Sequence, residues 1–118
     1  MKMFIIKNAE SALRKLVNAD LPIKIAFQIS SVIDEIDVHL QKFEEFRIDL
    51  VQKYGEKTDN GVEVKENIEE FNKEINDLLN AEVTVTVQSI DIDTFLSIDS
   101  VNISVAEIKA LQQLGIIK

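Results

Sequence analysis

The sequence has no cysteine and no tryptophan, and only one proline and three glycines. Without cysteine, disulfides, thiolate zinc sites and cysteine nucleophiles are excluded. The three glycines stand singly at predicted turns or helix ends, so no glycine-rich phosphate loop is present. No apolar run approaches the roughly 20 residues of a membrane span, and the first residues do not resemble a signal peptide. We therefore expect a cytoplasmic protein that does not bind membranes.

Basic residues are also scarce. Thirteen lysines and arginines face twenty-one acids, a net charge of −8, which counts against direct binding to nucleic acid or anionic lipid. All of this net charge falls after residue 54, and no base lies between Lys73 and Lys109. This predicts one strongly negative end, which is either a solvated surface or a face for a basic partner. The candidate partner-binding residues are Glu74, Asp77, Asp91, Asp93 and Asp99.

Length and apolar content favour one globular unit. The chain has 118 residues, of which 46% are hydrophobic, enough for one packed core. We expect a single domain over residues 1–118. Its helical part is predicted at about 8–80, and a small β part with a closing helix at about 81–118.

A long helix is predicted from Pro22 to Tyr54, because apolar residues recur there every three or four positions. At 1.5 Å per residue it would span roughly 50 Å. Arg47 is the one charge on its apolar seam, and we expect it to pair with an acid of the following helix. Further apolar residues outside this seam predict self-association, as a dimer. They are Phe27, Val38, Ile48 and Val51.

Two shorter helices are predicted to cover the long one. The first begins with Asn8 as its N-cap and is broken before Pro22. The second carries apolar residues from Val64 to Leu78 at helical spacing and should run back along the far half of the long helix. Between the long helix and this second short helix, Asn60-Gly61 is a strong hairpin signal. Residues 3–6 are a candidate edge strand.

After Asn80 the apolar period changes to two, which indicates strands at residues 83–87 and 90–92. Ser104 and Glu107 form a capping box that opens a short helix, and Gly115 should end it. The predicted fold class is α+β. A long helix lies antiparallel to two shorter ones, followed by a small antiparallel sheet and a short C-terminal helix.

No catalytic set assembles from the sequence. His39, the only histidine, falls among apolar residues of the long helix, which favours a core-edge or interface position over catalysis. Asp91 and Asp93 would share one face of a strand, either as metal ligands or as exposed edge acids. Asp59 lacks the further oxygen ligands of a calcium loop. We therefore expect a non-enzymatic protein with no cofactor, catalytic residue or metal site.

Several runs of the sequence resemble a family of small, functionally uncharacterised proteins of phages and prophages of Gram-positive bacteria. They include Leu21-Pro22 before the long helix and the Asp59-Asn60-Gly61 turn. The others are residues 54–57, 66–80, 82–83 and 103–107. The resemblance covers most of the chain and implies a viral origin inside a host cell. It implies no activity and no site residues.

Three functions are consistent with these observations. The first is stoichiometric binding of a host protein, possibly a defence component. The second is a role as a virion or assembly accessory protein or chaperone, acting on phage proteins. The third is an oligomeric sponge for a small nucleotide signal, which would need its few basic residues gathered into a pocket. They are Arg14, Lys15, Lys24 and Arg47.

Overall fold

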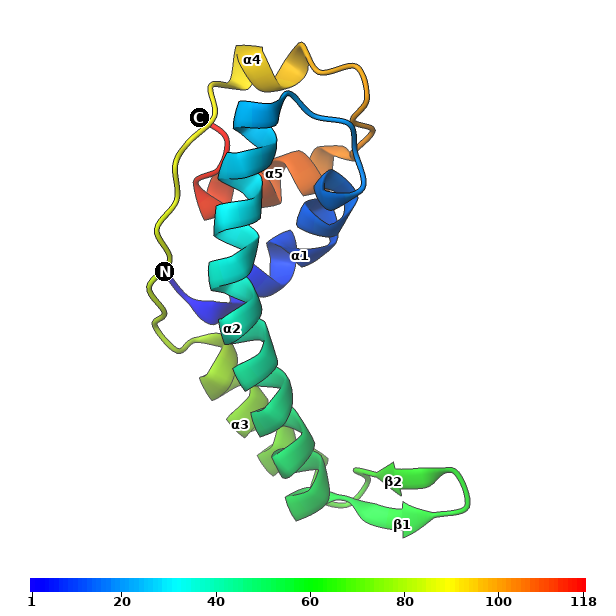
Figure 1. Cartoon of the computed structure of the whole chain (residues 1–118). Coiled ribbons are helices and arrows are strands. Elements are labelled where there is room, and N and C mark those ends of the chain that lie inside the picture. The colour runs from blue at the N-terminus through cyan, green and yellow to red at the C-terminus, as the bar shows by residue number, and fades with distance from the viewer.

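The computed structural model describes residues 1–118 and has the predicted α+β class. It is elongated, measuring 50 × 29 × 23 Å, with helix α2 as its axis (Figure 1). None of its helices is long and apolar enough to span a membrane. The elements are α1 (Met3–Val17), α2 (Ile23–Tyr54), β1 (Glu56–Thr58), β2 (Gly61–Glu63), α3 (Ile68–Leu79), α4 (Ile92–Leu96) and α5 (Val105–Leu114).

The long helix is confirmed as α2, which has 32 residues and begins directly after Pro22. Proline suits this position because it fixes φ and has no N–H to leave unpaired. The helix ends at Tyr54, and Gly55 follows as the C-cap, where an added Cβ would clash with the Val51 carbonyl oxygen. Its buried residues stop at Phe43, eleven positions before its end. The second half of α2 therefore lies outside the core.

Helix α1 begins at Met3, so the predictions of an edge strand at residues 3–6 and of an N-cap at Asn8 are wrong. Its buried residues recur at helical spacing from the first turn, which explains the earlier start. Asn8 is an exposed residue inside the helix. Helix α1 packs against both α2 and α5. Its buried residues are Met3, Ile6, Ala9, Ala12, Leu13 and Leu16.

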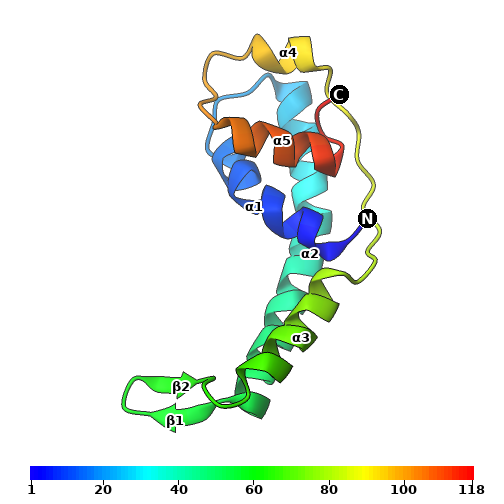
Figure 2. The same cartoon turned by 180° about the vertical axis from the view of Figure 1, so that it is seen from behind.

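Helix α3 runs back along the second half of α2, as predicted, and the two are joined by a β1–β2 hairpin (Figures 1 and 2). The hairpin turns at Asp59-Asn60, one residue before the predicted pair, and Gly61 begins β2 with a φ of +108° that favours glycine. The helix starts at Ile68, later than the predicted Val64, because residues 61–63 pair as β2. No residue of α3 is fully buried.

The segment after Asn80 is extended but forms no sheet, so the strands predicted at 83–87 and 90–92 are not present. Only single bridges form there, Lys2 with Glu82 and Ile90 with Ile117. The partly buried valines at 83, 85 and 87 alternate with exposed threonines as expected, but no neighbouring strand is available. The small antiparallel sheet of this protein is instead β1–β2.

Helix α5 confirms its predicted ends. Ser104 accepts a hydrogen bond from the Glu107 backbone N–H, and the Glu107 carboxylate accepts one from the Ser104 N–H. Gly115 ends the helix in the left-handed conformation, with a φ of +97°.

The hydrophobic core is confined to one end of the molecule. Its nineteen buried residues are all apolar and come from residues 3–43 and 90–117. Residues 44–79, which we call the arm, comprise the second half of α2, the hairpin and α3. The arm extends from the core with apolar side chains that are only partly covered.

Candidate functional site: an apolar groove on the arm

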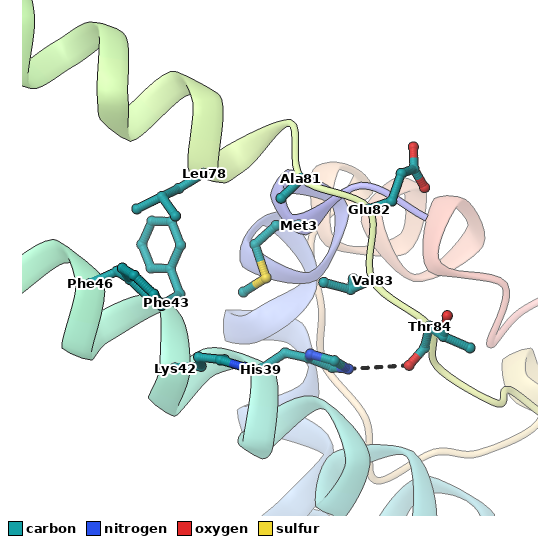
Figure 3. Close-up of a pocket in the computed structure, with 10 residues that line it drawn as sticks. All are labelled: Met3, His39, Lys42, Phe43, Phe46, Leu78, Ala81, Glu82, Val83 and Thr84. Carbon is teal, nitrogen blue, oxygen red and sulfur yellow. Dashed lines mark hydrogen bonds between the residues drawn. The ribbon is translucent and has the colours of Figure 1, made fainter.

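An open groove follows the line where α2 meets α3, from the edge of the core onto the arm. It consists of two adjoining pockets of about 450 and about 200 Å³ that share Phe46 and Leu78. Figure 3 shows the larger pocket, between α2, the end of α3 and the segment that follows it. The apolar residues that line the groove are Met3, Phe43, Phe46, Leu50, Leu78, Ala81 and Val83.

Helical spacing on α2 places the residues of one wall. His39, Phe43, Phe46 and Leu50 are separated by four, three and four positions, so they follow one edge of the helix. The opposite wall comes from α3, where Leu78 approaches Phe46. Met3 reaches the larger pocket from the start of α1. The groove therefore depends on three segments that are distant in the sequence.

The two rims of the groove carry opposite charge. Glu74, Asp77 and Glu82 lie on the rim formed by α3 and the segment after it, and Lys42 lies on the α2 rim. Lys53 Nζ lies 3.7 Å from Glu74 Oε1. The other oxygen of Glu74, Oε2, is buried without a hydrogen-bond partner.

Lys53 links α2 to this acidic rim. The side chains of Tyr54 and Glu74 together raise the pKa of Lys53 above its ordinary value. Its ammonium also lies 5.0 Å from the centre of the Tyr54 ring. Lys53 therefore remains charged and neutralises part of the Glu74 carboxylate, whereas Asp77 forms no ion pair.

His39 lies half-buried at the end of the groove near the core. Its Nε2 is 3.1 Å from the Thr84 carbonyl oxygen, and the contact joins α2 to the extended segment (Figure 3). No nucleophile or carboxylate is hydrogen-bonded to the ring.

The structure separates the five acids predicted to contact a partner. Glu74 and Asp77 lie together in the groove, whereas Asp91, Asp93 and Asp99 surround α4 at the opposite end of the molecule (Figure 1). Asp91 and Asp93 do not share a strand face, which corrects the expected geometry. Asp91 is the N-cap of α4 and accepts a hydrogen bond from the Asp93 N–H at 3.1 Å.

The basic residues named for a nucleotide sponge do not converge. Arg14 pairs with Asp37 at 2.6 Å and Lys15 pairs with Glu107 at 2.8 Å. Arg47 pairs with Glu44 of the same helix, so the predicted partner on α3 is wrong. Because these cations are already neutralised by separate carboxylates, they form no phosphate-binding pocket within one chain.

Sequence reasoning did not identify the groove as a site. It placed Phe46 on the apolar surface of the long helix and named Glu74 and Asp77 for their charge. A stronger signal was available in the spacing of Phe46 and Ile48, which are two positions apart and so lie on different sides of α2. The single helix α3 cannot cover both sides, and both residues are exposed.

Comparisons of the chain with protein-family models, curated proteins and solved structures find no match.

Proposed function

We propose that this protein acts without catalysis, by stoichiometric binding of another protein in the groove of the arm. The observation that supports this most directly is an apolar groove that begins at the edge of the core and continues along the arm, with Phe46 exposed between its two pockets. Burying apolar surface contributes about 25 cal/mol per Å², so a partner that covers Phe46 and Leu78 gains binding energy there. Such exposed apolar surfaces with polar rims are typical of protein-binding sites.

The resemblance to phage and prophage proteins favours a host protein as the partner, encountered in the host cytoplasm. A defence component is one such partner. A role in virion assembly would use the same groove for a phage protein, and the 50 Å length of the molecule suits that alternative as well. The ion pairs of Arg14, Lys15 and Arg47 make the nucleotide sponge the weakest of the three hypotheses.

The proposal can be tested by affinity capture from the lysate of a Gram-positive host, using two matched variants. Phe46→Asp places a charge in the groove, and Phe27→Asp makes the same change on the exposed outer side of α2. Both phenylalanines are exposed, so both variants should fold, which circular dichroism will check. We expect a protein captured at about one copy per chain by the wild type and by Phe27→Asp, and lost with Phe46→Asp.

The opposite pattern, with loss only in Phe27→Asp, would move the binding surface to the outer side of α2. Equal capture by all three proteins would exclude the groove as the site.

A further inference from the structure

We infer that the groove receives one amphipathic helix of the partner, with basic residues along the flank that faces α3. This inference rests on the proposed function and specifies the chemistry of the occupant. The groove extends along α2 from His39 to Leu50, a rise of eleven residue steps, which corresponds to about 17 Å. A helix of about three turns fits this length.

A helix suits the groove better than an extended peptide does. The floor is formed mainly by helix side chains, and the backbones of α2 and α3 are already hydrogen-bonded internally. An added strand needs unpaired N–H and C=O groups at an edge. Beside the groove, the Val83 N–H already donates to Met1 and the Thr84 carbonyl is already bonded to His39, which leaves only a short edge at Glu82 and Thr84.

A third helix would instead complete the packing that α2 and α3 leave open. Phe46 and Leu78 lie at the junction of the two pockets, one on each wall. An apolar residue of the incoming helix seated between them, with others three, four and seven positions away, would cover the floor.

Charge determines which helix binds. The arm has eleven acidic and five basic residues, a net charge of −6. Asp77 is exposed on the α3 rim and pairs with no cation, whereas Glu74 already lies beside Lys53. A lysine or arginine on the flank of the incoming helix can pair with Asp77. A second copy of this chain would bring its own acidic arm, so repulsion disfavours self-occupancy of the groove.

The test is selection of random 16-residue peptides, displayed as a library, on the intact protein. We expect the recovered peptides to be apolar at positions i, i+3 or i+4, and i+7, with lysine or arginine on one flank. Fluorescence anisotropy with a recovered peptide should show at least tenfold weaker binding to Asp77→Lys. Asp59→Lys makes the same charge change in the hairpin turn and should bind as the wild type does. A peptide with its basic flank changed to glutamate should recover binding to Asp77→Lys.

Acidic or non-helical recovered peptides would overturn this inference, as would no recovery at all or equal binding to Asp77→Lys and Asp59→Lys. Any of these peptide results is compatible with the proposed function, provided that capture of the host protein from lysate still requires Phe46. Conversely, capture that does not depend on Phe46 contradicts the proposed function, whatever peptides are recovered.

Discussion

Phe43 and Phe46 are one turn apart on α2, yet Phe43 is 8% exposed and Phe46 is 48% exposed. Helix α1 reaches Phe43, where Lys7 Nζ lies 5.3 Å from the centre of the ring. Phe46 lies beyond this cover and opens into the groove beside Leu78. The boundary between the closed core and the open arm therefore falls within a single helical turn.

The two aromatic residues expected to anchor the helices should contribute unequally to stability. Phe43→Ala should lower the free energy of unfolding by about 3–5 kcal/mol, because the ring is buried. Phe71 of α3 is only half-buried, so Phe71→Ala should cost about half as much. Chemical denaturation of both variants measures the difference. Equal losses would show that the arm is packed as tightly as the core.

The capping box of α5 should make part of the stability depend on pH. The Lys15 ammonium and the Ser104 N–H both bind the Glu107 carboxylate and lower its pKa. The stabilisation is therefore fully present above the ordinary glutamate pKa of about 4.3 and is lost as the pH falls through the lowered value.

Glu107→Gln should consequently destabilise the protein near neutral pH, with a difference from the wild type that shrinks in acid. Thermal melts across a pH series measure this. The control Glu66→Gln removes an exposed carboxylate with no ion pair and should have a smaller effect near neutral pH. A loss for Glu107→Gln that does not vary with pH would contradict the assignment.

Self-association is expected through the outer side of α2, away from the groove. Ile23, Phe27, Val38 and Ile48 are exposed, whereas Val51 is half-buried. We expect a dimer in light scattering over a concentration series. Phe27→Asp combined with Val38→Asp should give a monomer and leave the groove intact. A wild-type protein that is monomeric at every concentration would refute this expectation.

Association with a basic partner should weaken as salt rises, because the screening length falls from about 10 Å at 0.1 M to about 3 Å at 1 M. Glu74→Gln with Asp77→Asn should slow the association of a recovered peptide and reduce its salt dependence. The matched pair Asp93→Asn with Asp99→Asn removes the same charge near α4 and spares the Asp91 cap. Stopped-flow kinetics compare the two. A larger effect of the α4 pair would place the working acidic surface there.

Local chemistry was sufficient to predict much of the fold. Apolar residues at helical spacing indicated α2 to within one residue of its start, and Asn60-Gly61 indicated the hairpin turn. Ser104, Glu107 and Gly115 indicated both ends of α5. Each of these features depends on residues that are close together in the sequence. Residue spacing, helix capping and backbone conformation therefore determine it without contacts to distant segments.

The candidate site was only partly predictable. The sequence supplied Glu74 and Asp77 as acids and Phe46 as an apolar helix residue. It could not join Met3 or Val83 to them, because those contacts form only when α1 and the extended segment close around α2. The acids near α4 looked equivalent to those of α3 in the sequence, and only the fold separated them along the long axis.

Taken alone, the sequence determined the α+β class, the long helix, the hairpin turn and the concentration of negative charge after residue 54. Tertiary structure decided that residues 83–87 have no strand partner, that Asp91 caps a helix, and that the core ends at Phe43. The physical reason is that periodicity shows which side of a segment prefers burial, but not which segment, if any, comes to cover it.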